Sequence, residues 1–113
     1  MSRRSSAALN LADAAPVFAA LGDPTRVKLV ARLSADGPLS ISRLSEGTGV
    51  TRQAITKHLR AMDKAGLVRA SRHGREQIFE LEPRRLEKAR RYLDQVSTDW
   101  DNAINRLRSF VED

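Results

Sequence analysis

Apolar side chains recur at intervals of three and four residues through the first third of the chain, which is the spacing of an amphipathic helix. We expect one helix over residues 9–21, ended by Gly22 in a left-handed conformation. A second helix follows at once, because Asp23 supplies a capping oxygen and Pro24 suits the first turn of a helix. This helix ends near residues 36–38, so two helices meet at a sharp corner.

The middle of the chain predicts two more helices joined by a tight turn. Residues 39–48 favour a short helix capped by Ser40, and residues 47–50 form the turn. Thr51 then caps a longer helix over residues 51–65, which Gly66 ends. Its inward face carries apolar residues at i, i+4 and i+7, namely Ile55, Leu59 and Met62.

A β-hairpin follows this pair of helices. Residues 67–71 and 77–82 have the composition of short strands, and they flank a polar tip over residues 72–76 with a glycine at the turn. The whole of residues 67–82 therefore forms a two-stranded β-ribbon, which we call the wing.

The last third of the chain predicts one long helix over residues 83–112. Apolar positions follow one another at steps of three and four residues, a heptad pattern held for more than three repeats. Thr98 or Asp99 would serve equally as the cap of a new helix, but the unbroken pattern favours a single helix. The seam contains Leu86, Ala89, Leu93, Val96, Trp100, Ala103, Leu107 and Phe110.

The length of 113 residues suits one domain with one modest core. We expect residues 9–113 to form this domain and residues 1–8 to be a flexible basic tail. No apolar run is long enough for a membrane span, and no signal peptide follows the basic start, which places the protein in the cytoplasm, at the nucleoid. The predicted fold is mostly α-helical with a two-stranded wing, a winged helix-turn-helix with helices on both flanks.

Charge is distributed unevenly along the chain. The net charge is +6, but residues 51–92 hold twelve Lys or Arg against five Asp or Glu, a net of +7. Residues 1–50 carry +2 and residues 93–113 carry −3. A basic middle favours one face that binds a polyanion, although a basic surface facing only water would give the same count.

The helix over residues 51–65 has the chemistry of a DNA-reading helix. An α-helix fits the major groove of B-DNA, where Arg pairs with guanine, Gln with adenine, and Thr contacts the thymine methyl. We expect Arg52, Gln53 and Thr56 to read bases, and Lys57 and Arg60 to hold phosphates. The full set of expected DNA-binding residues is Ser40, Thr51, Arg52, Gln53, Thr56, Lys57, His58, Arg60 and, on the wing, Arg72, His73 and Arg75.

Four segments together resemble the ArsR/SmtB-type family of bacterial repressors. Residues 18–26 (FAALGDPTR) are similar to its opening signature, and residues 51–59 (TRQAITKHL), 65–68 (AGLV) and 72–75 (RHGR) are together similar to its recognition helix and wing. The resemblance covers about residues 15–82. It implies a homodimer that binds operator DNA and leaves it when an inducer binds.

The metal-sensing motif of that family is missing. Ser40 and Ser42 align with a Cys-x-Cys pair of metal-sensing members, the chain has no cysteine, and a serine hydroxyl cannot replace a thiolate toward a soft metal. Other members bind zinc through His and carboxylates on the last helix, which here has three Asp residues and no His. We expect no metal site and no cofactor, and the inducer, if one exists, stays unidentified.

A homodimer is expected from the two flanking helices. The long seam is too apolar to face water, and the first helix offers a second apolar stripe. The expected interface residues are Val17, Phe18, Leu21, Leu86, Ala89, Leu93, Val96, Trp100, Leu107 and Phe110.

Together these patterns predict a sequence-specific regulator, a homodimeric repressor of double-stranded operator DNA arranged as an inverted repeat. A non-specific architectural protein that binds nucleic acid is the alternative. An enzyme is not expected, because no cluster of titratable residues, nucleophile or phosphate-binding glycine loop is visible. The operator and the regulated genes have no signature in the sequence.

Overall fold

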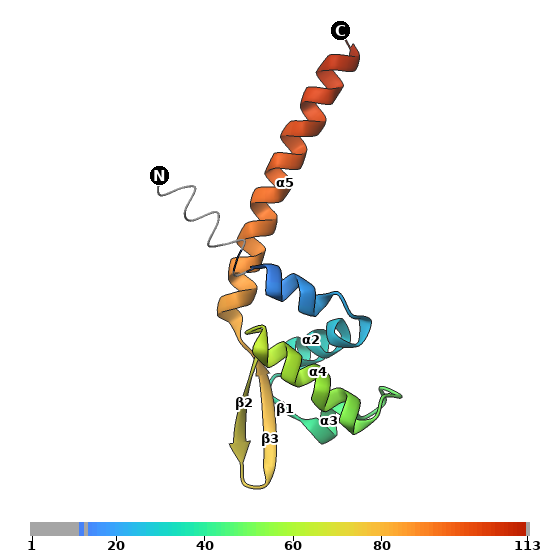
Figure 1. The fold of residues 1–113 in the computed structure, drawn as a ribbon, viewed down its shortest axis with the longest axis vertical. Coiled ribbons are helices and arrows are strands. Elements are labelled where there is room, and N and C mark those ends of the chain that lie inside the picture. Colours follow the sequence, from blue (N-terminus) through green and yellow to red (C-terminus); the bar gives the residue numbers. More distant parts are fainter. Residues whose placement is uncertain (1–11, 13, 113) are drawn as a thin grey trace.

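The computed structural model describes residue 12 and residues 14–112 (Figure 1). A helical stretch over residues 14–21 leads into α2 (Pro24–Asp36), β1 (Leu39–Ser40), α3 (Ile41–Ser45), α4 (Arg52–Lys64), β2 (Val68–His73), β3 (Glu76–Leu81) and α5 (Pro83–Glu112). The expected fold class, mostly helical with a small antiparallel sheet, is confirmed. The expected tail over residues 1–8 lies outside the described residues.

One hydrophobic core holds these elements together. Each helix contributes the apolar stripe that its sequence period predicts, and the base of the hairpin closes the core from the other side. The largest fully enclosed side chains come from every part of this body: Val17, Leu29, Leu44, Ile55, Leu59, Met62, Leu67 and Val68. The body is thereby a rigid frame for the surface residues of α4 and of the wing.

The sheet has three strands, in the order β1-β3-β2, where the sequence predicted two. The expectation of a helix from residue 39 was wrong by two residues: Leu39 pairs with Phe79 and Ser40 with Ile78 in an antiparallel register. Ser40 must be extended because it caps α3, and its extended backbone then pairs with the edge of β3.

The wing is longer and tighter than predicted. Strand β2 continues to His73 and β3 begins at Glu76, so only Gly74 and Arg75 form the turn. Gly74 has φ +65°, the left-handed conformation that a two-residue hairpin turn of this kind requires.

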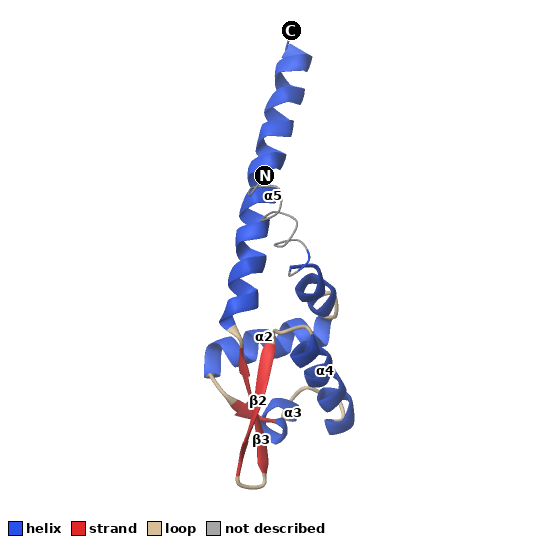
Figure 2. Cartoon of the chain, turned by 60° about the vertical axis from the view of Figure 1, so that its left-hand side comes forward, coloured by secondary structure: helices blue, strands red, loops and turns tan. Residues whose placement is uncertain are grey.

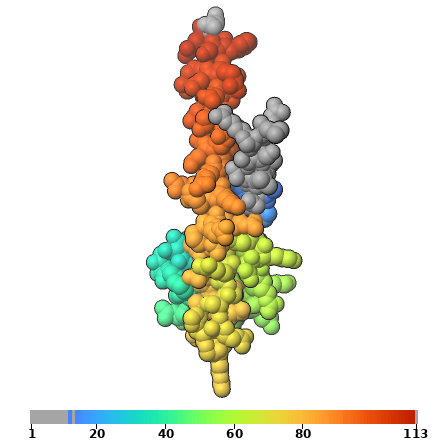
Figure 3. Space-filling view, turned by 90° about the vertical axis from the view of Figure 1, so that its left-hand side faces the viewer, coloured from blue at the N-terminus to red at the C-terminus, as the bar shows by residue number. Residues whose placement is uncertain are grey.

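Helix α5 is a single helix of 30 residues, which decides between the two arrangements that the sequence left open. Only its first turns touch the body: Ala89 is buried, and the ring centroid of Tyr92 lies 6.0 Å from that of Phe18. Beyond Leu93 the helix projects away from the body, at the opposite end of the molecule from the wing tip (Figures 2 and 3). The long axis of the molecule is therefore 65 Å.

The predicted helix caps are present, but one glycine was misjudged. The side chains of Asp23, Ser40 and Thr51 accept hydrogen bonds from the third residue after each of them, at 3.1 to 3.2 Å. Gly22 does not have a positive φ, so that expectation was wrong. A side chain there would approach the carbonyl oxygen of Ala19 at 3.3 Å, so the position instead favours a residue without a Cβ.

We predict that Gly66→Ala destabilises the protein more than Gly47→Ala does. Both glycines have positive φ, which costs an alanine about 1 to 2 kcal/mol. At Gly47 a Cβ meets nothing, whereas at Gly66 it would lie 2.8 Å from Cγ of Arg85, close to the backbone of α5. Gly66→Ala should therefore lose about 1 kcal/mol more, measured by urea unfolding at one protein concentration. Equal losses would contradict the close approach of Arg85.

Candidate nucleic-acid interface

The outer face of α4 presents five polar side chains together. Ile55, Leu59 and Met62 are fully buried, and this fixes which side of the helix is exposed to solvent. The opposite side lines a shallow depression of about 370 Å³ formed by Arg52, Gln53, Thr56, Lys57 and Arg60. The structure thus brings together five of the residues expected to bind DNA.

The hydroxyl group of Thr56 already has a hydrogen-bond partner within α4. Its hydroxyl donates a hydrogen bond to the carbonyl oxygen of Arg52, at 2.8 Å. The hydroxyl is therefore engaged within the helix, and the methyl group is the part of the side chain left for a partner. Gln53, Lys57 and Arg60 are exposed, with no hydrogen bond or ion pair recorded among the described residues.

The turn before α4 is held by a single threonine. The hydroxyl of Thr48 donates to the carbonyl oxygen of Ser45 at 2.8 Å and accepts from the backbone N–H of Val50 at 3.1 Å. Thr51 then caps the helix through Ala54. These local bonds set the position at which α4 begins, and Arg52 and Gln53 lie in its first turn.

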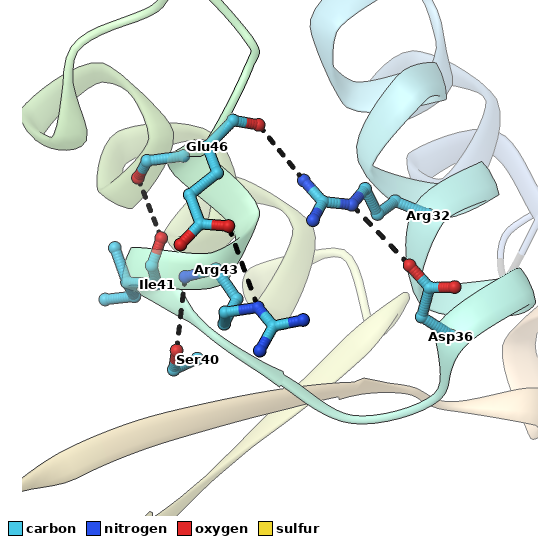
Figure 4. A network of polar contacts seen from close by, with 7 residues as sticks. Arg32, Asp36, Ser40, Ile41, Arg43 and Glu46 are labelled. Carbon is cyan, nitrogen blue, oxygen red and sulfur yellow. Dashed lines mark hydrogen bonds and ion pairs between the residues drawn. The ribbon is translucent and has the colours of Figure 1, made fainter.

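A polar contact from α2 reaches the end of α3, the helix that precedes the turn (Figure 4). Nη1 of Arg32 donates to the carbonyl oxygen of Glu46, at 3.2 Å, and Nε of Arg32 lies 3.6 Å from the carboxylate of Asp36. Ser40 is only 7% exposed, because its side chain caps α3 through Arg43. The structure therefore places Ser40 in a capping role rather than on an exposed surface.

His58 does not lie with the other α4 residues expected to bind DNA. Its side chain is turned toward the start of α2, where Nε of Arg26 donates to Nδ1 of His58 at 3.1 Å. Asp23 lies 3.9 Å from the same nitrogen. No local pattern in the sequence indicates this contact, because Arg26 and His58 are 32 residues apart. This hydrogen bond connects the middle of α4 to the start of α2.

The wing carries a second group of exposed basic side chains. Arg72, His73 and Arg75 surround the turn at Gly74, all exposed. Nearer the body, Arg69 is neutralised by Glu80 and Glu82, each at 3.3 Å. The positive charges of Arg72 and Arg75, in contrast, have no ion pair among the described residues.

The expected dimer residues fall into two groups. Val17 and Ala89 are buried within this chain, and Phe18, Leu21 and Leu86 pack partly against its core. Leu93, Trp100, Leu107 and Phe110 are more than half exposed, and Val96 is partly exposed. Among the described residues, no group of three or more His, Cys, Asp or Glu is placed to hold a metal ion, and no helix could cross a membrane.

Comparisons with known proteins agree with this geometry. A family model described as a helix-turn-helix domain matches residues 21–70. The HTH-type transcriptional regulator Rv2034 of Mycobacterium tuberculosis is 32% identical, over 82% of this chain and 83% of that protein. An ArsR-like transcriptional regulator from Rhodococcus sp. RHA1 superposes with a TM-score of 0.73 and 35% identity, over 88% of this chain and 92% of that one.

A further solved structure is similar to this chain over 81% of its length and 83% of the other. It is the homodimeric winged helix-turn-helix DNA-binding domain Mb0332 of Mycobacterium bovis, with a TM-score of 0.63 and 29% identity.

We predict that Thr51→Ala lowers the free energy of unfolding by about 1 kcal/mol, because it removes the cap of α4. Thr51→Ser keeps the capping oxygen and should retain most of the stability. Thermal or urea unfolding of the two variants measures the difference. If serine and alanine destabilise equally, the hydroxyl is not what holds the start of α4.

Proposed function

Because this chain belongs to the ArsR family of winged helix-turn-helix transcriptional regulators, we propose that it is a homodimeric repressor of an inverted-repeat operator. The observation that carries the proposal is the exposed polar face of α4, set by the buried face behind it. A helix of this width enters the major groove and presents its first turns to base edges.

The side chains divide into two roles along α4. Arg52, Gln53 and Thr56 lie near the start of α4, where base edges are within reach, and the free methyl of Thr56 suits a thymine. Lys57 and Arg60 lie to the side or further along the helix and contact phosphates. His58 is a positioning residue that holds α4 against α2.

The wing supplies a contact outside the major groove. Its tip is a two-residue turn with Arg72, His73 and Arg75 around it, narrow and basic enough to enter a minor groove. The neutralised Arg69 at the base of the wing takes no part in this contact.

Affinity for DNA favours a homodimer, and so does the apolar surface of α5. One winged helix offers few contacts, whereas a twofold dimer places two recognition helices one turn of DNA apart, about 34 Å, so that the operator is an inverted repeat. The exposed apolar face of α5 supplies a surface for the second copy. The similar domain from Mycobacterium bovis is homodimeric, which supports a homodimer here as well.

Selection of bound fragments from a random pool of duplex DNA tests this function. The expected result is an enriched inverted repeat with half-sites about ten base pairs apart. Mapping of bound sites across the genome would then identify the regulated genes. A pool that stays random while binding remains tight would instead support a non-specific architectural protein.

We predict that Gln53→Ala weakens binding to the selected operator by about 1–3 kcal/mol per half-site but leaves binding to random duplex nearly unchanged. Lys57→Ala, the matched phosphate contact, should weaken both and lower the salt dependence. Lys64→Ala removes an exposed charge from the far end of α4 and serves as the control. Equal losses on both DNAs for Gln53→Ala would disprove base reading by that residue.

We predict that zinc, cadmium and arsenite do not release the protein from its operator. Ser40 is a buried cap and neither it nor Ser42 offers a thiolate, so soft metal ions lack their preferred ligands. Each metal is titrated into a preformed complex at neutral pH and followed by fluorescence anisotropy. Stoichiometric dissociation by any of the three would overturn this prediction and show a metal-responsive repressor.

A further inference from the structure

A cavity of about 270 Å³ lies between α2 and the turn that leads into α4. Leu29 and Leu44, both buried, and the half-buried Val50 give it an apolar lining. Pockets for drug-sized ligands have volumes of about 300–1,000 Å³, so this cavity suits a smaller organic molecule. Its apolar lining favours a ligand that has an apolar part to bury there.

Two basic side chains of α2 line the same cavity. Thr25, Lys28 and Arg32 follow one another at steps of three and four residues, so they share one face of the helix. Lys28 is exposed, with no hydrogen bond or ion pair among the described residues. Nη1 of Arg32 donates to the carbonyl oxygen of Glu46 and Nε lies 3.6 Å from the carboxylate of Asp36, which leaves Nη2 without a partner among those residues.

The charge around the cavity favours an anion. Glu46 supplies its only acidic side chain, and that carboxylate lies 3.8 Å from Nε of Arg43 on the neighbouring helix. Lys28 and Arg32 therefore carry the positive charge that a ligand meets. Ammonium and guanidinium groups form their strongest hydrogen bonds with carboxylate and phosphate oxygens.

We propose that this cavity binds a small organic anion, an apolar molecule with one carboxylate or phosphate group, and that this anion is the effector of the repressor. The inference rests on the proposed function, because it supplies the signal to which the same DNA-binding protein responds. The apolar part of the anion lies on Leu29 and Leu44, and its charged group lies between Lys28 and Arg32.

The turn couples the cavity to DNA binding. Gly47 and Thr48 line the wall opposite α2, and the Thr48 hydroxyl holds the turn directly before the cap of α4. Arg32 now joins α2 to this wall through the carbonyl oxygen of Glu46 (Figure 4). A bound anion competes with that neutral carbonyl for the guanidinium and forms the stronger bond. The wall then loses its link to α2, and the start of α4 moves away from the position that base reading requires.

A phosphate of bound DNA is the other source of the same anionic chemistry. A phosphodiester has no apolar group to place on the buried Leu29 and Leu44, whereas an organic anion has one. The residues expected to read DNA lie on the outer face of α4, which forms a separate depression. The lining of the cavity therefore favours the small molecule, and the experiments below separate the two sources.

Titration of the DNA-free, full-length protein with small probes tests the site. The probes are benzoate and phenyl phosphate, with benzamide as a neutral molecule of similar shape, and amide chemical shifts are followed by nuclear magnetic resonance. At least one of the two anions should give saturable shifts at Lys28, Gly47 and Thr48, and benzamide should bind about tenfold more weakly or less. Absence of saturable shifts at these amides with both anions overturns the inference, and so does equally tight binding of benzamide.

Substitution of Lys28 tests the charge without disturbing the core, because this side chain is exposed. Lys28→Gln should weaken binding of the anionic probe about tenfold, whereas Lys28→Arg keeps the charge and should retain most of the affinity. Lys64→Gln removes a charge that lies outside this cavity and serves as the matched control. Equal affinities for Lys28→Gln and Lys64→Gln overturn the role of Lys28 and, with it, the proposed site.

A titration of the operator complex tests the coupling. The probe that binds should lower operator affinity about fivefold or more, measured by fluorescence anisotropy, and bound operator should lower probe affinity by the same factor. Lys28→Gln should bind the operator normally and lose the response. If Lys28→Gln itself weakens operator binding and lowers its salt dependence, Lys28 holds a DNA phosphate and the effector site is disproved, while the repressor stands. If the protein selects no operator, the proposed function fails, whereas the probe titration without DNA still decides whether the cavity binds anions.

Discussion

The burial of one face of α4 is the constraint on which the rest of the molecule depends. Ile55, Leu59 and Met62 are fully enclosed, so the helix can neither rotate about its axis nor slide without opening the core. Because side chains repeat every 3.6 residues, fixing this face also fixes the opposite one. The direction in which Gln53 and Lys57 point is therefore a consequence of hydrophobic packing rather than of any polar contact.

Polar contacts refine this placement at points where packing alone leaves freedom. The caps at Asp23, Ser40 and Thr51 fix where three helices begin, and Arg32 ties α2 to the segment between α3 and α4. The contact of Arg26 with His58 adds a link from α2 to the middle of α4. Each bond contributes only about 1 kcal/mol to stability, so their main effect is to select one geometry among several well-packed ones.

Features that depend on residues close together in the sequence could be predicted from it. Features that depend on contacts between residues far apart in the sequence could not. The caps, the α4 face and the wing follow from residues within a few positions of one another. Strand β1 was missed because a two-residue strand has no period of its own and forms only where β3, almost forty residues later, offers an edge. His58 was assigned to the DNA surface because its helix is basic, whereas its partner is 32 residues away. Val17 and Ala89 were assigned to the dimer because an apolar stripe does not show which part of it is covered by its own chain.

Helix α5 packs against the body through its first turns and projects away from it along the rest of its length. Its first turns are part of the core, through Ala89 and through the contact of Tyr92 with Phe18, while its outer turns carry the exposed stripe. A stiff helix transmits any change of angle at this joint to its far end, and conversely a fixed far end fixes the orientation of the body. The proposed homodimer requires its two copies of α4 to keep one spacing and one orientation on DNA. The contact between Phe18 and Tyr92 therefore links the packing of the body to the direction in which α5 projects.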